Sequence, residues 1–132
     1  MPRASARFIR AAWSWFLVGL ALGVLLALGR LRWGGAFLLA AGAPHVHVLL
    51  FGFLVQWVMG VAYWVYPRRG GRRPPPRTEK WPLRVWWFLN GGTLLRAIGE
   101  SLWGLPTAGL AQAAFAVGIL LQVGAGFYFV AK

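Results

Sequence analysis

Four long apolar segments, separated by connections that hold most of the charge, constrain this chain more than any other feature. They run from about 8 to 28, 44 to 66, 83 to 103 and 107 to 130, and each is close to the roughly 20 residues that a helix needs to cross a bilayer. Charged residues make up only 12% of the chain, about half the share found in soluble domains. The sequence therefore predicts an all-α fold, an integral membrane four-helix bundle that forms a single transmembrane domain over residues 1–132.

Prolines mark the ends of the predicted helices. Pro44, Pro82 and Pro106 suit first turns, where a missing backbone N–H costs no hydrogen bond, and Pro67 ends the second helix. The connection 67–82 is basic and rich in proline and glycine, a composition that breaks helices and stays in water. We therefore expect a solvated basic loop between the second and third helices.

The distribution of basic residues predicts the orientation in the membrane. The chain has 14 Lys and Arg against 2 Asp and Glu. The N-terminal segment and the 67–82 loop outweigh the other two connections, so the positive-inside rule places both termini in the cytoplasm. No basic face with stacking aromatic residues forms outside the membrane, so we expect a lipid bilayer as partner and no nucleic acid. We expect a multi-pass protein of the inner (cytoplasmic) membrane of a prokaryote.

The two histidines of the chain, His45 and His47, open the second apolar segment. On a helix their side chains point about 200° apart, so an undistorted helix cannot offer both to one iron. A polar ring beside a bilayer needs a hydrogen bond or a metal, and neutral imidazole is a common ligand of metals and haem iron. One hypothesis is that at least one histidine binds a metal or haem iron, and the alternative is that both are interfacial side chains solvated by water.

The charged residues within the third segment, Arg96 and Glu100, have the i, i+4 spacing of an intrahelical pair. This segment is expected to run from the inside to the outside, which places Glu100 near the depth of His47. Glu100 would then accept an N–H bond from a ligating imidazole. Arg96, Arg30 or Arg32 would hold carboxylates such as haem propionates. The alternative is a self-neutralising pair that fixes helix packing.

The other polar side chains of the segments are expected to form hydrogen bonds between helices; they are Asn90, Gln56, Gln112 and Gln122. Gly19 and Gly23 have small-xxx-small spacing and would permit close helix contact, within the bundle or between two copies of it. The chain has no cysteine, which excludes thiolate sites. No serine is paired suggestively with a histidine, and a single intramembrane acid cannot form a carboxylate dyad. We expect no independent catalytic activity.

Residues 45–68 carry the resemblance to a known family. The run HVHVLLFGF from His45 to Phe53, followed by MGVAYW from Met59 to Trp64 and then by Tyr66-Pro67-Arg68, resembles the second helix of subunit I in haem–copper oxidases. The nearest likeness is to the nitric oxide reductase branch, and the run also resembles the His-x-His segment of NnrS-type membrane proteins.

In the haem–copper oxidase family this helix supplies a histidine ligand to the low-spin haem b. The resemblance therefore implies His47 as the axial ligand, with His45 close behind. The helix that supplies the second ligand in the family is missing here, as are the histidines of the second metal site. Reduction of oxygen or nitric oxide by this chain alone is thereby excluded.

Three functions follow from these observations. The leading one is a membrane haem b protein, used for electron transfer or as an accessory of a respiratory oxidase or nitric oxide reductase. Its second axial ligand would come from a homodimer that shares one haem, or from another subunit of a respiratory complex. The alternative is copper binding and delivery by His45 and His47, because imidazole suits copper(II). A third possibility is a non-catalytic structural subunit.

Overall fold

The computed structural model describes residues 1–31, 41–65, 80–103 and 108–131. The described residues are almost entirely helical and contain no strand. The elements are α1 (Arg3–Arg30), α3 (Gly42–His47), the π-helix η1 (Val48–Val55), α4 (Gln56–Val65), α5 (Lys80–Ser101) and α6 (Ala108–Val130). Because α3, η1 and α4 follow one another without a break, they form one continuous rod, Gly42–Val65.

The helix positions predicted from the apolar segments are confirmed to within a few residues. Pro44 lies in the first turn of α3 and Pro82 in the first turn of α5, where no intrahelical partner waits for their missing N–H. The stop expected at Pro67 and the start expected at Pro106 lie outside the described residues.

Three of the described helices are long and apolar enough to cross a membrane, namely α1, the rod Gly42–Val65 and residues Gly109–Val130 of α6. The chain is therefore a membrane protein by the length and composition of its helices. Helix α5, with 22 residues, is long enough to span but more polar, and a fourth span remains a prediction. Its polar side chains recur every three or four residues and form one stripe: Asn90, Thr93, Arg96 and Glu100.

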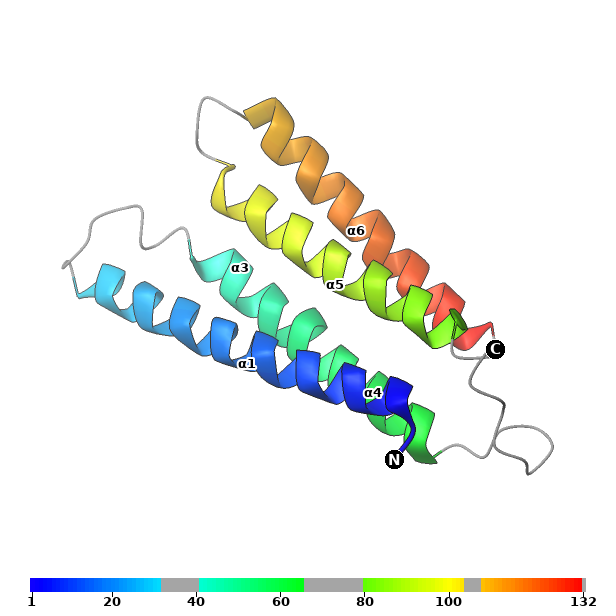
Figure 1. Cartoon of the computed structure of the whole chain (residues 1–132). Coiled ribbons are helices and arrows are strands. Elements are labelled where there is room, and N and C mark those ends of the chain that lie inside the picture. Colours follow the sequence, from blue (N-terminus) through cyan, green and yellow to red (C-terminus); the bar gives the residue numbers. More distant parts are fainter. Residues whose placement is uncertain (32–40, 66–79, 104–107, 132) are drawn as a thin grey trace.

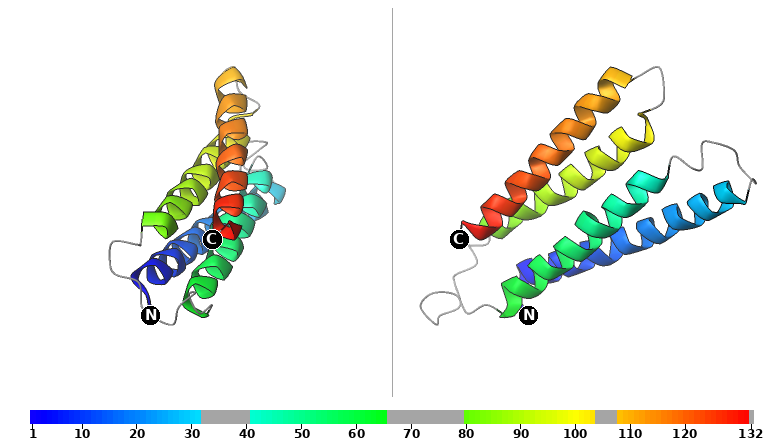
Figure 2. Two further views of the ribbon diagram at one scale, coloured as in Figure 1. Left: turned by 90° about the vertical axis from the view of Figure 1, so that its right-hand side faces the viewer. Right: turned by 180° about the vertical axis from the view of Figure 1, so that it is seen from behind.

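The helices are arranged as two antiparallel pairs that lie side by side (Figures 1 and 2). Helix α1 packs along the α3–η1–α4 rod, and α5 packs along α6. The pairs meet mainly where α5 contacts α3 and η1, so α5 is the central helix and α6 the peripheral one. Helix α1 begins and α6 ends at the same end of the molecule. A closed four-helix bundle remains a prediction.

The hydrophobic core is concentrated near the end where α1 and α5 begin. Its buried members come from all four rods: Phe8, Met59, Val85, Leu89 and Ala125. Aromatic rings continue this core between the rods, because Tyr63 of α4 lies 5.3 Å from Phe8 and 5.2 Å from Phe129 of α6, centroid to centroid. The opposite half of the interface between the pairs is polar, and it contains the candidate site.

Candidate functional site

The two histidines face different helices, as their spacing predicts. His45 points to α1, where its Nδ1 lies 2.8 Å from the carbonyl oxygen of Gly19. His47 points to α5, where it meets Arg96 and Glu100. The two rings therefore do not form one nitrogen pair, and each has its own surroundings.

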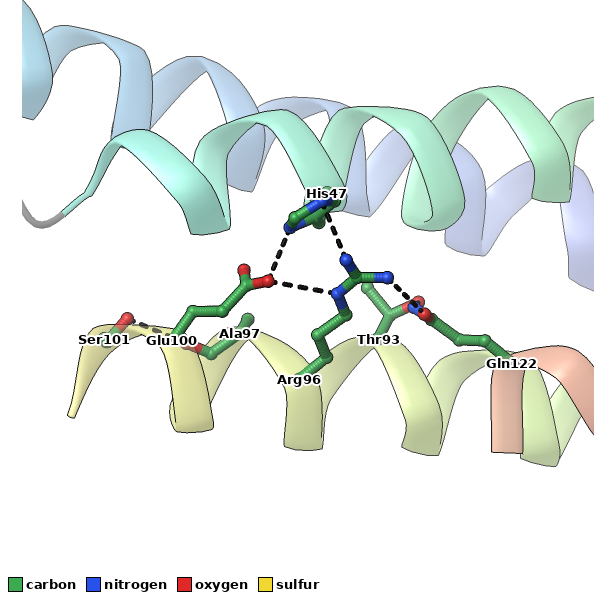
Figure 3. A network of polar contacts seen from close by, with 7 residues as sticks. All are labelled: His47, Thr93, Arg96, Ala97, Glu100, Ser101 and Gln122. Carbon is green, nitrogen blue, oxygen red and sulfur yellow. Dashed lines mark hydrogen bonds and ion pairs between the residues drawn. The ribbon is translucent and has the colours of Figure 1, made fainter. Parts of the chain in front are cut away.

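His47, Arg96 and Glu100 form a three-membered cluster between α3 and α5 (Figure 3). Nδ1 of His47 lies 2.5 Å from Oε1 of Glu100, and Nε of Arg96 lies 3.0 Å from the same oxygen. Nη2 of Arg96 lies 2.8 Å from Nε2 of His47. The predicted approach of His47 and Glu100 is present in the structure, while the contact of Arg96 with the histidine is an addition that the spacing did not predict.

The protonation pattern of the His47 ring follows from its partners. A guanidinium can only donate, so Nε2 accepts from Arg96 and the ring hydrogen sits on Nδ1, facing the carboxylate. The Nδ1–Oε1 approach is not aligned as a hydrogen bond, so we regard it as mainly electrostatic. With a neutral ring the cluster carries one positive and one negative charge, and these compensate each other in its partly buried position between the two helix pairs.

Arg96 is held by three further groups. Its Nη1 donates to Oε1 of Gln122 on α6 at 3.1 Å, and its guanidinium carbon lies 5.3 Å from the ring centre of Phe51 and 5.5 Å from that of Phe115. These distances are typical of cation–π contacts. Gln122 in turn donates to Thr93, so Arg96 connects the α3–η1 rod, α5 and α6.

Burial separates the members of the cluster. The side chains of Glu100 and Arg96 are 7% and 13% exposed, whereas that of His47 is 28% exposed. Oε2 of Glu100 is buried and has no hydrogen-bond partner among the described residues. Oε2 can therefore still accept a hydrogen bond. Of the three side chains, that of His47 is the most exposed.

The π-helix η1 explains how two polar side chains of one rod both reach α5. His47 and Gln56 are nine residues apart, about two and a half turns of an α-helix, which would place them on opposite faces. In a π-helix each hydrogen bond spans one more residue, so the turn widens and nine residues make about two turns. Both side chains consequently face α5, and a uniform α-helix, as predicted from the sequence, would have separated them.

A second polar cluster lies further along the same interface. Oδ1 of Asn90 accepts from Nε1 of Trp15 at 2.7 Å and from Nε2 of Gln56 at 3.3 Å. The interhelical hydrogen bonds predicted for Asn90, Gln56 and Gln122 are thus present, whereas Gln112 is exposed on α6. The bond from Trp15 was not predicted, because no polar pattern in the sequence marks this tryptophan.

The remaining residues proposed from the sequence lie apart from the cluster. Arg30 is exposed at the end of α1, and Arg32 lies outside the described residues. Gly19 and Gly23 face the α3–η1 rod. A Cβ added at Gly19 would lie 2.3 Å from a side-chain carbon of Leu49, and a Cβ added at Gly23 would lie 2.9 Å from Cε1 of His45. These glycines serve contact within the chain, which is one of the two roles predicted for them.

Within the parts of the chain that the structure describes, no three His, Cys, Asp or Glu side chains come together as a metal site. Comparison with protein-family models, with curated proteins and with solved structures gives no match.

Proposed function

We propose that this chain is a membrane haem b-binding protein, used for electron transfer or as an accessory of a respiratory oxidase or nitric oxide reductase. The observation that carries this proposal is the contact between Nδ1 of His45 and the carbonyl oxygen of Gly19, at 2.8 Å. A carbonyl only accepts, so the hydrogen of the neutral ring sits on Nδ1 and Nε2 keeps its lone pair. Metal-ligating histidines are oriented in this way.

The geometry favours His45 over His47 as the ligand. Nε2 of His47 already accepts from Arg96, so iron could bind there only after the guanidinium moved away. Nδ1 of His47 faces Glu100, an arrangement that also suits a ligating ring. His47, the ligand implied by the resemblance, is therefore the second candidate ligand. It would bind iron through Nε2 after Arg96 had moved away.

The residues present fit haem b in donor chemistry. An imidazole would bind the iron, and an arginine would bind the propionates, because guanidinium groups hold carboxylates bidentately. For His45 that arginine would be the exposed Arg30 of α1, and for His47 it would be Arg96 once released from Glu100 and Gln122. The bound haem would supply a one-electron couple. Since the chain has only two histidines and they face different helices, a second axial imidazole would come from a second copy or from another subunit. We therefore include a homodimer or a respiratory complex in the proposal.

An absorbance spectrum tests the proposal directly. The full chain is purified from a haem-sufficient bacterial host, and the Soret band is compared among the parent, His45→Gln and His47→Gln, with Gln112→Ala as a control for an exposed polar side chain. We expect a Soret band that is lost in His45→Gln and kept in Gln112→Ala. Loss only in His47→Gln would reverse the ranking of the ligands, and the absence of a Soret band from the parent would contradict haem binding.

A structural subunit without a cofactor is the second candidate, and the His47–Arg96–Glu100 cluster favours it. The cluster joins the two helix pairs, and its charges compensate each other within the protein. A colourless parent protein whose assembly depends on Arg96 would support this function. Copper binding by the histidine pair is the weaker alternative, because the two rings would first have to turn toward each other.

We further propose that α5 is a fourth span, that both termini lie in the cytoplasm, and that the protein belongs to the inner membrane of a prokaryote. The position of α5 beside α6, along most of its length, supports the fourth span (Figure 1). The excess of basic residues in the N-terminal segment and in the 67–82 loop supports the orientation.

A further inference from the structure

A shallow groove lies where α1 and α5 begin, at the opposite end of the interface from the histidine cluster. Its lining residues are Ala4, Arg7, Phe8, Pro82, Leu83 and Trp86. It is too shallow to enclose a small molecule, so it suits a ligand that lies along the protein surface. The walls are apolar except for one guanidinium and one indole N–H.

The charge around this groove has one sign. Arg7 is exposed, and Arg3 and Arg10 are also exposed at helical spacing on the same side of α1. Arg84 on α5 is exposed too. Among the described residues the sole carboxylate side chain is that of Glu100, near the other end of α5. The positive charge at this groove therefore has no compensating acid within the described part of the chain.

The indole N–H of Trp86 lies just behind the groove wall. Its Nε1 is buried and has no acceptor in the described structure, although the ring forms part of the groove wall. A buried N–H without an acceptor costs free energy comparable to a lost hydrogen bond. A ligand with acceptor oxygens for Arg7 and an apolar chain beside Leu83 would complement the groove, and a small shift of the indole would let Nε1 of Trp86 reach one of those oxygens.

We propose that this groove binds an anionic phospholipid, with the headgroup phosphate on Arg7 and an acyl chain along Leu83 and the ring of Trp86. The membrane supplies such lipids at the depth where a helix begins, and basic residues near the surface attract them. Charge complementarity selects this occupant, since the groove offers donors and a cation but no acceptor. The proposal does not depend on haem binding.

Native mass spectrometry of the full chain in detergent tests the site. The protein is mixed with equal amounts of phosphatidylglycerol and phosphatidylcholine, and the retained lipids are counted for the parent and for Arg7→Gln and Trp86→Phe. Arg10→Gln and Trp87→Phe are matched controls, because they make the same changes at exposed positions outside the groove. Circular dichroism confirms that each variant retains its helices.

We expect the parent to retain phosphatidylglycerol preferentially and Arg7→Gln to lose that preference by about fivefold, since one basic residue near a membrane surface contributes on the order of 1 kcal/mol. Trp86→Phe should lower retention, whereas both controls should match the parent. Equal losses in Arg7→Gln and Arg10→Gln would show that net charge alone acts and would overturn the site. Displacement of the lipid by millimolar inorganic phosphate would overturn a lipid occupant.

Discussion

At the scale of single residues, Arg96 is the side chain on which the polar half of the interface depends. It contacts Glu100, His47 and Gln122 through separate nitrogens, and two aromatic rings cover its faces. A cation buried between the two helix pairs is tolerated because each of its three nitrogens donates to a partner. Removing either Arg96 or Glu100 alone should therefore destabilise the protein more than removing both.

The Arg96–Glu100 pair can be tested by substitution. Glu100→Leu alone leaves the Arg96 cation buried without a carboxylate, and Arg96→Leu leaves the Glu100 carboxylate facing only the His47 ring, so we expect each to lower the free energy of unfolding by about 3 kcal/mol. The double variant Arg96→Leu/Glu100→Leu leaves no buried charge and should be more stable than either single variant. Thermal unfolding followed by circular dichroism in detergent measures the order of stabilities.

Arg84→Leu is the control, because Arg84 is an exposed arginine of the same helix and should change the unfolding temperature little. Additive losses in the double variant would contradict the interpretation. They would mean that the two side chains stabilise the protein independently rather than through each other.

At the scale of elements, the helices were predictable and the π-helix was not. The apolar segments and the prolines at 44 and 82 fix where helices lie, because burial in a bilayer forces each apolar segment to satisfy its own backbone hydrogen bonds. The run VLLFGFLV of η1 is apolar at every position, so it carries no periodicity from which a widened turn could be read. The one indication in the sequence is that His47 and Gln56 lie nine residues apart, so a uniform α-helix would place these two polar side chains on opposite faces.

The candidate site was predictable in part, for a related reason. Glu100 was expected at the level of His47, because the start of the second segment and the end of the third lie on the same side of the membrane when the two run antiparallel. The contact of Arg96 with His47 could not be predicted, because it depends on how α5 is rotated about its own axis. Arg96 contacts His47 and keeps its bond to Glu100. Thr93 and Phe115 were missed because an isolated threonine or phenylalanine in a span usually serves packing alone.

The α5–α6 contact provides the prediction of this scale. A Cβ added at Gly118 would lie 2.6 Å from the backbone nitrogen of Arg96 and 2.8 Å from the carbonyl oxygen of Gly92. Backbone atoms cannot move aside singly, so Gly118→Ala should separate the helices and destabilise the protein by on the order of 2 kcal/mol. Thermal unfolding in detergent measures this loss.

Gly124 on the same helix provides the matched control, because a Cβ added there would meet nothing within 4 Å. Gly124→Ala should be neutral or slightly stabilising, since alanine favours the helix over glycine. Equal behaviour of the two variants would show that α5 and α6 do not pack as closely as the structure has them.

At the scale of the whole molecule, the two helix pairs divide the interface into an apolar half and a polar half. The apolar half contains Phe8, Met59 and Leu89, and the polar half contains the His47–Arg96–Glu100 cluster. The pairs meet mainly at the polar half, where α5 contacts α3 and η1. Rearrangement there, such as a movement of Arg96 on ligand binding, would therefore change how the two pairs are held together.

The topology provides the last prediction, and it decides whether α5 crosses the membrane. The chain has no cysteine of its own, so single cysteines introduced at the exposed residues Arg3, Ala43, Ser101 and Ala131 report their side without background. In bacterial spheroplasts, a membrane-impermeant maleimide should label Ala43→Cys and Ser101→Cys. Arg3→Cys and Ala131→Cys should react only after lysis.

The position of Ala131 separates four spans from three. With four spans, α1 begins and α6 ends on the same side of the membrane, as they do at one end of the molecule (Figure 1). With three spans, Ala131→Cys would react from the outside while Arg3→Cys stayed protected. That result would take α5 out of the bilayer and contradict the proposed fourth span, whereas the contact of His45 with α1, on which the haem proposal rests, would be unaffected.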